Sequence, residues 1–402
     1  MKRLPIVALL LATACDGESN AGVHTVRDSA GVQIVESRAP RWQSGTRWRI
    51  DSLPAVAIGV EEGAAEYQFS VVRGAIRTKL GRIVVSDATS RQIRIFDSTG
   101  AFLAAVGGPG QGPGEFGSSL MRLWQAPAGT LWVNDDGNGR MNVFHERGTF
   151  VESVVLRPPA EVPLPSPIGV FADGTVLAMG VVGGPTPDAG IPGRVMRSDA
   201  SYLQFAPTGD YLREIVRLPG RPRFGYTFRG STSSSFIPLT SSPVVAPGAN
   251  GLFVYRGPAA EVEERTTASQ LRRILRWNPE VRRVSDVWDA FKRASLEAEG
   301  VTPAGRELYR FFHELPLPLP NEVPAVEALL VDEEGFLWAR RYRLPWESAH
   351  QWDILSPRGE WLGTLTSPAG LSITHLGSRF IVGVHRDGLG IERIRVHRLI
   401  RE

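Results

Sequence analysis

The chain has 402 residues, an apolar share of 42% and a net charge of +3, so it is long and apolar enough to bury a full core. Its 43 glycines and 30 prolines are spread along the whole length, which excludes a largely disordered protein and favours a fold rich in turns. The basic residues form no concentrated stripe, which excludes a nucleic-acid-binding protein.

The N-terminal residues have the pattern of an export signal. Basic residues precede the apolar run 4–12 in "MKRLPIVALLLATACDG", and this run is too short to span a bilayer stably. The residues "ATA" before Cys15 resemble a bacterial lipobox. This resemblance implies a signal peptide over 1–14, a lipidated Cys15 and a polar tether over 15–22. We therefore expect an exported protein that is membrane-anchored at the bacterial cell envelope, in either membrane; the alternative is an ordinary signal peptide.

Cys15 is the only cysteine of the chain. The sequence therefore excludes a disulfide framework and a thiolate metal site.

Two neighbouring segments repeat each other. Residues 81–106, "GRIVVSDATSRQIRIFDSTGAFLAAV", align without a gap to residues 129–154, "GTLWVNDDGNGRMNVFHERGTFVESV", at a spacing of 48. Apolar residues alternate, as at Ile83 and Val85, with the period of two that half-buried strands need. Gly100 takes the fourth position of a turn, which suits a tight hairpin. Each copy therefore predicts three short strands.

The glycine-rich stretch between the copies is "GGPGQGPGEF", residues 107–116. A phosphate-binding loop would need a lysine and a following helix, and neither is present here. Glycines allow positive φ angles and the prolines stiffen the loop. We expect this stretch to connect two repeat units rather than to cradle a phosphate.

The repeat unit recurs along the chain. A strand with a leading glycine begins at Gly81, Gly129, Gly174, Gly251, Gly335 and Gly377. The second hairpin recurs at 205–212 and 355–362, with a weaker copy at 277–284. Six four-stranded units with long insertions predict an all-β fold, a six-bladed β-propeller with antiparallel blades over residues 23–402.

We expect insertions near 182–197, 219–236 and 285–320. The last contains a helical pair, with Ser285 and Thr302 as candidate caps. This pair is either packed structure or a lid or docking surface. The insertion at 219–236 has the composition of a long loop, which in a compact domain is often functional or mobile.

The N-terminal residues can supply a strand that the last repeat unit lacks. The last unit ends at 393–399, "RIRVHRL", with no outer strand after it. An N-terminal strand around 32–35, which follows a turn in "DSAGVQIV", would complete the last blade and leave no exposed edge.

A known family is now apparent. The stretch "GGPGQGPGEF" followed by "GTLWVNDDGNGRMNVF" resembles the NHL-repeat propellers. Residues 135–141 match the family's Asp-x-x-Asn-x-Arg-Ile run, whereas the first copy keeps Asp87 but departs from the run at Ser90 and Gln92. The segments "DEEGFLWARRYRLP" and "HRDGLGIERIRVHRL" also resemble six-bladed propeller lipoproteins of environmental bacteria.

A resemblance to two enzymatic types of propeller would imply a metal site in this chain. The gluconolactonase-type and peptide-amidating-lyase-type propellers hold a divalent ion on the channel axis through Glu, Asp, Asn or His. The corresponding candidates here are Asp87, Asp135, Asp136, Asn138, His375, His385 and Asp387. In NHL-like units the repeated Asp usually bonds backbone groups of a turn, and a structural role is the competing interpretation.

No catalytic constellation stands out. The seven histidines form no metalloprotease pattern and no G-x-S-x-G elbow is present. His385 and Asp387 form either an acid–base pair or part of a solvated loop.

The favoured interpretation is a monomeric, lipid-anchored scaffold that binds an envelope protein or a small-molecule ligand. The alternative is a metal-dependent, lactonase-like hydrolase or lyase that uses Ca²⁺ or another divalent ion in the central channel. Candidate ligand-binding residues at the channel mouth are Glu115, Asp87, Asp135, Asn138, Arg341 and His385.

Overall fold

The computed structural model describes residues 23–42, 47–118, 121–183, 191–249, 251–298 and 300–401. The expected signal peptide, Cys15 and the tether lie outside the described residues. Over the described ranges, no helix has both the length and the apolar character needed to cross a membrane.

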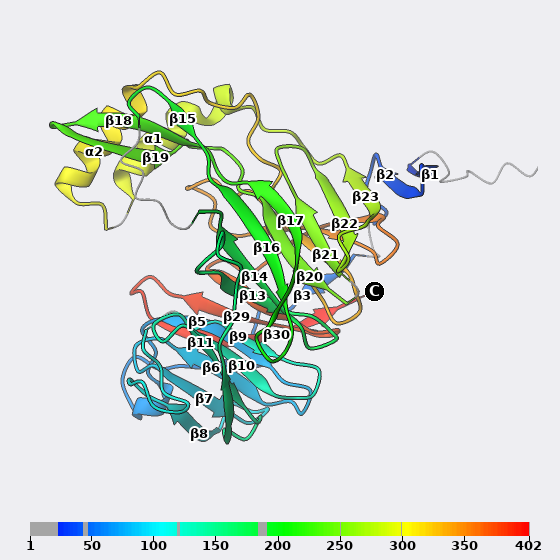
Figure 1. The fold of residues 1–402 in the computed structure, drawn as a ribbon, viewed down its shortest axis with the longest axis vertical. Coiled ribbons are helices and arrows are strands. Elements are labelled where there is room, and N and C mark those ends of the chain that lie inside the picture. The colour runs from blue at the N-terminus through cyan, green and yellow to red at the C-terminus, as the bar shows by residue number, and fades with distance from the viewer. Residues whose placement is uncertain are drawn as a thin grey trace, which may run out of the picture.

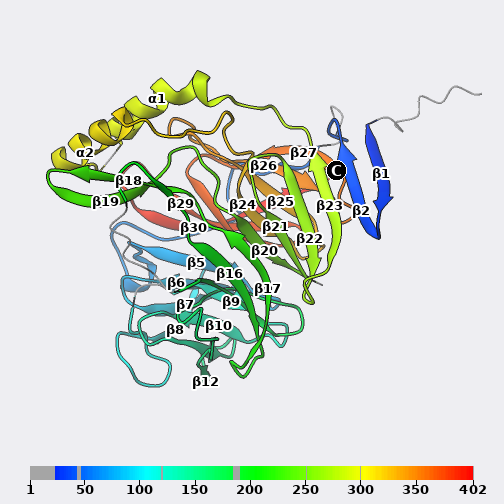
Figure 2. The same ribbon diagram turned by 45° about the horizontal axis from the view of Figure 1, so that its top comes forward.

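Six sheets with one repeated strand order form most of the molecule (Figures 1 and 2). Blade 1 contains β5 (Val72–Arg77), β6 (Ile83–Asp87), β7 (Gln92–Phe96) and β8 (Phe102–Gly107). Blade 2 contains β9 (Leu123–Gln125), β10 (Leu131–Asp135), β11 (Arg140–Phe144) and β12 (Phe150–Val154). Blade 3 contains β13 (Ser166–Val170), β14 (Val176–Val181), β16 (Asp199–Phe205) and β17 (Tyr211–Pro219).

The second half of the ring follows the same plan. Blade 4 contains β20 (Val244–Gly248), β21 (Gly251–Tyr255), β22 (Glu261–Thr266) and β23 (Leu271–Trp277). Blade 5 contains β24 (Val326–Val331), β25 (Leu337–Arg341), β26 (Gln351–Leu355) and β27 (Trp361–Thr366). Blade 6 contains β28 (Leu371–Leu376), β29 (Phe380–Arg386) and β30 (Glu392–Ile400). The fold is therefore the predicted six-bladed β-propeller.

A hydrophobic cluster fills each boundary between neighbouring blades. At the boundary of the last and first blades, Val382 and Ile394 pack with Ile83 and Val85. Because the clusters cover both faces of each blade, the second strand is buried throughout in blades 1, 2 and 4, where it is β6, β10 and β21. These clusters close the ring and explain the near-continuous apolar runs in the sequence.

The repeat of 48 residues is confirmed in the first two blades, where β10 and β11 begin 48 positions after β6 and β7. The weaker hairpin expected at 277–284 is wrong. In blade 4 the second hairpin joins β22 to β23 at 267–270, and Trp277 is the last residue of β23.

An N-terminal strand completes the last blade, as predicted, but it is not the strand expected at 32–35. The strands β3 (Arg49–Ile50) and β4 (Val56–Ile58) pair with β30. Residues 32–35 belong to β2 (Val32–Ser37), which pairs in parallel with β23 of blade 4. A short alternating strand fits any exposed outer edge, so its pattern alone does not select the blade.

The N-terminal segment follows the outer rim of three blades. The strand β1 (His24–Ser29) pairs with β2 outside blade 4. The backbone N–H groups of Arg41 and Trp42 then donate to the carbonyls of Trp361 and Leu362 in blade 5, at 3.0 and 2.7 Å. After a link that includes a short 3₁₀ turn, Ala65–Tyr67, the chain enters blade 1.

A lobe outside the ring, called the accessory lobe, contains a small sheet and two helices. The sheet has β15 (Val195–Met196), β18 (Arg223–Phe228) and β19 (Ser231–Phe236), and the helices are α1 (Val284–Glu297) and α2 (Pro303–Glu314). The long loop expected at 219–236 is therefore wrong, because the segment forms a hairpin. Phe224 and Tyr226 pack with Phe312 of α2, and this alternation of aromatic residues outweighs the Gly- and Ser-rich composition.

The predicted helical pair is confirmed, with one change at a cap. The Thr302 hydroxyl accepts a hydrogen bond from Gly305 N–H at 3.1 Å, as a capping residue should. Ser285 is not a cap, because α1 begins at Val284. Val284 is buried against Leu239 and Val323, so packing determines where α1 begins.

The ring has two different faces. Short hairpins emerge on one face, whereas the links from the second to the third strand and the blade-to-blade connectors emerge on the other, called the connector face. Every part of the accessory lobe is inserted into a link of the connector face. The lobe accordingly lies beside that face, at the upper left of Figure 1.

Candidate functional site

The six candidate ligand-binding residues from the sequence all lie on the connector face, but in different blades. Asp87, Asp135, Arg341 and His385 lie at or next to the ends of the second strands of blades 1, 2, 5 and 6. Asn138 lies in the following link of blade 2, and Glu115 in the connector before it. The repeated topology places them on one face without gathering them at one point.

Glu115, Asp135 and Asn138 do come together, around the glycine-rich connector. The buried Asp135 carboxylate accepts hydrogen bonds from Gly117 N–H at 2.9 Å and from Asn138 Nδ2 at 2.7 Å. Asn138 Nδ2 also donates to the Gly110 carbonyl at 3.0 Å, and Glu115 Oε2 accepts from Gly112 N–H of the same connector at 2.8 Å. These polar groups are engaged in holding the connector.

Asp87 occupies the equivalent corner of blade 1. Its carboxylate accepts from Thr89 N–H at 3.1 Å and Ser90 Oγ at 2.6 Å, and it pairs with Arg94 at 2.7 Å. Arg94 also donates to the carbonyls of the preceding link, with a distance of 2.7 Å to Gln68.

Arg94 holds the link before blade 1 in place, and this role was not predicted from the sequence. Arg140 of blade 2 donates to the carbonyls of Gly112 and Glu115 in its own preceding connector. Arg94 makes the equivalent hydrogen bonds in blade 1, but it is the third residue of β7, whereas Arg140 is the first residue of β11. The signal was an arginine in the middle of the buried strand "QIRIF".

These carboxylates do not fit a divalent ion. Asp87 and Asp135 each direct their oxygens to backbone groups and arginines of their own blade. Within the part of the chain that the structure describes, no cluster of three or more His, Cys, Asp or Glu has the proximity of a metal site.

His385 and Asp387 are close in sequence but no hydrogen bond joins them. The Asp387 carboxylate pairs with Arg393 and accepts from Leu389 N–H at 3.0 Å, so it stabilises its own turn. Burial is the main cause that lowers the pKa of His385. His375 lies elsewhere, on the inner strand of blade 6, where Nδ1 accepts from Arg77 N–H at 3.2 Å.

Arg341 is the candidate residue that lines a cleft. This cleft, of about 460 Å³, lies where the chain leaves blade 4 and where it enters blade 5. We call it the seam cleft. It is lined by residues 258–261, 276–282 and 322–325 together with Arg341, Glu347 and Gln351.

The charge of Arg341 is already neutralised. Its guanidinium donates to both oxygens of Asp353, at 3.0 and 2.9 Å, and to Thr364 Oγ1 at 2.9 Å. Asp353 is buried and also accepts from Trp277 Nε1 at 3.0 Å. This network ties the outer strand of blade 4 to blade 5.

The other arginines of the seam cleft are also paired. Arg276 pairs with Glu261 at 2.5 Å, and Arg282 pairs with Glu347 at 3.1 Å. Glu280 and Glu322 are exposed and form no ion pair with any described residue. The charges still free for a ligand are therefore negative.

The seam cleft has a lining of mixed character. Its lining contains prolines, alanines, amides, carboxylates and guanidinium groups. None of the described lining residues is Ser, Thr, Cys, Lys, Tyr or His, so the only side chains of the cleft that could act as nucleophiles are its glutamates.

A comparison with protein families supports the ring architecture. A family model described as "6-bladed beta-propeller" matches residues 70–119, which is one blade and the connector after it. No curated protein sequence matches the chain.

Several solved structures align over most of the chain at low identity. A Bacteroides fragilis protein with the provisional description of an exported protein aligns with TM-score 0.47 and 11% identity, over 92% of this chain and 99% of its own. Virginiamycin B lyase from Staphylococcus aureus aligns with TM-score 0.43 and 13% identity, over 88% and 100%. A gluconolactonase from Xanthomonas campestris aligns with TM-score 0.44 and 14% identity, over 83% and 87%. Similarity at this level carries no information about substrate or reaction.

Proposed function

We propose that the protein is an exported, membrane-anchored propeller that binds a ligand or an envelope protein in the seam cleft. The observation that carries this proposal is the charge of the cleft lining, where every arginine is paired while Glu280 and Glu322 form no ion pair with any described residue. A pocket of this size is typical of ligand-binding sites.

The free carboxylates define the chemistry of the partner. Glu280 and Glu322 lie on the two chain segments that border the seam cleft, on either side of the inserted helices. A cationic group seated between them would form charge-assisted hydrogen bonds. The preferred ligand therefore carries an ammonium or guanidinium group, as a lysine or arginine of a partner protein does.

Anchoring through Cys15 would keep the ring near the membrane. Nine residue steps separate Cys15 from His24, the first residue of β1, which spans about 30 Å when fully extended. The rim of blade 4, where β1 lies, and the neighbouring seam cleft would then face partners at the membrane surface.

A titration with charged peptides tests the cleft. We expect pentalysine to bind the purified domain, residues 23–402, and pentaglutamate not to bind. The double variant Glu280→Gln, Glu322→Gln should weaken pentalysine binding about tenfold or more, by the loss of charge-assisted bonds. Glu297→Gln, at the exposed end of α1, is the matched control and should bind as the unaltered protein does.

Two results would contradict the proposal. Equal pentalysine binding by the double variant would show that the carboxylates are not the recognition element. Turnover of a lactone or ester by the purified domain, faster than the uncatalysed reaction, would favour the enzyme alternative.

A further inference from the structure

The accessory lobe contains a second hollow, separate from the seam cleft. It has a volume of about 500 Å³ and lies between the β18–β19 hairpin and the helices α1 and α2. We call it the lobe pocket. Its helix side is mainly apolar, with Phe291, Ala294, Ala298, Leu308 and Phe312 in the lining beside the polar Ser295, Tyr309 and His313. This combination of size and apolar lining is typical of sites for small organic ligands.

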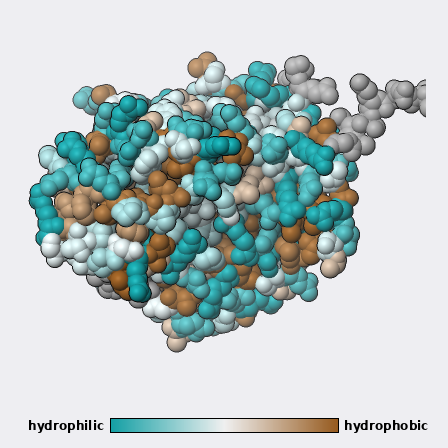
Figure 3. Space-filling view, turned by 90° about the horizontal axis from the view of Figure 1, so that it is seen from above, coloured by the Kyte–Doolittle hydropathy of each residue, from teal (hydrophilic) through white to brown (hydrophobic). Residues whose placement is uncertain are grey.

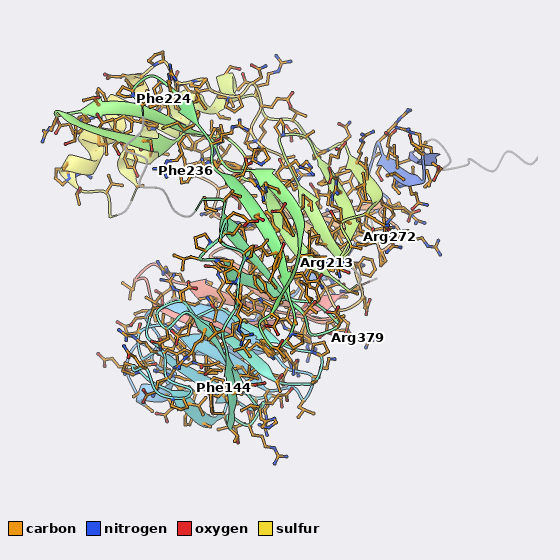
Figure 4. The ribbon with its side chains drawn as sticks, viewed as in Figure 1. Phe144, Arg213, Phe224, Phe236, Arg272 and Arg379 are labelled. Carbon is orange, nitrogen blue, oxygen red and sulfur yellow. The ribbon has the colours of Figure 1, made fainter. Side chains whose placement is uncertain are left out.

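The opposite side of the lobe pocket carries two arginines around one exposed ring. The guanidinium groups of Arg221 and Arg223 lie 5.1 and 4.9 Å from the centre of the Phe236 ring. The space-filling view from this side of the molecule shows a mosaic of hydrophobic and hydrophilic side chains (Figure 3), and Figure 4 shows Phe236 and Phe224 in the lobe.

Neither arginine has an acidic partner. No Asp or Glu lines the lobe pocket, and neither guanidinium forms an ion pair with any residue that the structure describes. In the seam cleft, by contrast, each arginine is paired with a carboxylate. Arg221 is partly buried, and this burial lowers its pKa.

The partners of these arginines are neutral groups. Arg221 donates to Thr240 Oγ1 and to the Ile237 carbonyl, each at 3.2 Å. Arg223 donates to the Oγ and the carbonyl of Ser234, at 3.0 and 2.7 Å. Two like charges beside one ring repel each other, and the cation–π contacts compensate only part of the cost. An anion between them would neutralise both and would accept hydrogen bonds from either fork.

A further polar atom on the pocket wall lacks a partner. His313 of α2 lines the lobe pocket, and its Nδ1 is buried with no hydrogen bond among the described residues. Its ring is stacked on Tyr309, whose centre lies 6.1 Å away. A buried polar atom without a partner is costly, and a bound ligand would supply one.

We propose that the lobe pocket binds an amphiphilic organic anion, with its acidic head between Arg221 and Arg223 and its apolar body against the two helices. This site is independent of the seam cleft and has the opposite charge preference. The pocket is too small and too apolar for a polyanionic macromolecule and lacks the further cations that such a ligand would need. The ligand class is therefore a small carboxylate or a related monoanion with a hydrophobic body.

A pair of fluorescent probes that differ in charge tests the head group. The anion 8-anilinonaphthalene-1-sulfonate should bind the purified domain, whereas the neutral N-phenyl-1-naphthylamine, which has the same rings, should bind about tenfold more weakly or worse. Equal affinity for the two probes would overturn the proposal, because the arginines would then contribute nothing.

Arginine variants locate the probe. Arg221→Gln or Arg223→Gln should raise the dissociation constant of the sulfonate about tenfold, with little effect on the neutral probe. The matched control is Arg379→Gln, an exposed arginine that Figure 4 places on the ring away from the lobe, and it should bind normally. If the arginines served folding alone, both lobe variants would melt at lower temperature and would bind the sulfonate as before, which would overturn the proposal.

Competition distinguishes an amphiphile from a simple anion. Decanoate should displace the sulfonate probe, whereas decanol and inorganic phosphate should each be much weaker competitors. Ala294→Phe, which fills the apolar side of the pocket, should weaken both probes while the arginines remain. Displacement by inorganic phosphate as effective as that by decanoate would show an anion site without an apolar subsite and would overturn the assignment.

Discussion

Asp353 is the residue on which the junction of blades 4 and 5 depends. It is buried, and it accepts hydrogen bonds from Arg341, Thr364 and Trp277. A buried carboxylate is tolerated only when it is paired and fully hydrogen-bonded. The network therefore gives Arg341, a candidate ligand-binding residue, a clear structural role beside the seam cleft.

Removal of Arg341 should destabilise the ring. Arg341→Gln leaves the Asp353 charge buried without a cation, and we expect a loss of about 3–5 kcal/mol in the free energy of unfolding. Urea unfolding followed by tryptophan fluorescence measures this loss. Arg379→Gln, which is exposed, should change stability by less than about 0.5 kcal/mol. A loss below about 1 kcal/mol for Arg341→Gln would mean that the charge is not buried as described.

His375 should make the free energy of unfolding depend on pH. Burial lowers its pKa to about 4 from the usual 6.5, so at intermediate pH the unfolded chain takes up a proton that the folded chain does not. The free energy of unfolding should therefore fall as the pH is lowered from about 6.5 to about 4. His375→Gln, whose amide oxygen can still accept from Arg77 N–H, should remove about 2–3 kcal/mol of this loss.

Unfolding curves at several pH values measure this effect. Part of the dependence should remain in the variant, because burial also lowers the pKa of His350 to about 4. The same slope in both proteins between pH 7 and 4.5 would show that the His375 ring is not buried in its neutral form.

The sequence located these residues only in part. A turn role for Asp135 was implied by the resemblance to the NHL repeat, and the structure shows the bonds that Asp135 and Asn138 make to the connector. Arg94 could not be predicted, because in blade 1 the guanidinium comes from a different strand position than in blade 2. The pairing of Arg341 with Asp353 depends on side chains from neighbouring strands, and strand register is not visible in one sequence.

The glycine-rich connector is the element that joins blades 1 and 2. Gly107 has a φ of +89°, and a Cβ atom there would lie 2.5 Å from Phe116 Cε2. Phe116 is buried in the cluster that joins the two blades. The glycine is therefore needed both for the turn and for the close approach of this ring.

Alanine at Gly107 should cost more than alanine at an open glycine. Gly139 also has a positive φ, +63°, but a Cβ atom there would meet nothing within 4 Å. We expect Gly139→Ala to lose about 1 kcal/mol for the backbone alone. Gly107→Ala should lose roughly 1–3 kcal/mol more, because the buried ring must also move. Equal losses in thermal or urea unfolding would contradict the close contact.

Prediction from sequence was strongest for elements that repeat. The alignment at a spacing of 48 predicted the strands of blades 1 and 2, and the leading glycines predicted the second strand of every blade. The β18–β19 hairpin was missed because residues 220–236 have the composition of a loop. Its partner, α2, follows some 70 residues later in the chain, so the packing that orders the hairpin is not local.

Across the whole molecule, the N-terminal segment supports the ring in two ways. The strands β1 and β2 cover the outer edge of blade 4, whereas β3 and β4 complete blade 6. The general closure of the ring by an N-terminal strand could be predicted from the missing last strand. The identity of that strand could not, because 32–35 and 56–58 are equally suitable short apolar segments.

Two truncations separate these roles. A chain that begins at residue 39 loses β1 and β2 but should still unfold cooperatively, with some self-association through the exposed edge of β23. A chain that begins at residue 60 also loses β3 and β4, and it should lose the cooperative transition because blade 6 is then incomplete. Thermal melting and size-exclusion chromatography measure both effects. A cooperative, monomeric domain from residue 60 would contradict this account of closure.

Recognition of a partner by the connector face, through the seam cleft, can be tested in cells. The most direct measurement is photo-cross-linking in cells from benzoylphenylalanine at Asn278, an exposed residue that lines this cleft, with the same amino acid at Arg379 as the control. We predict a discrete adduct from position 278 that disappears when Glu280→Gln and Glu322→Gln are added, and no adduct from position 379. Failure to form an adduct at 278, or an adduct that persists without the two carboxylates, would contradict the claim.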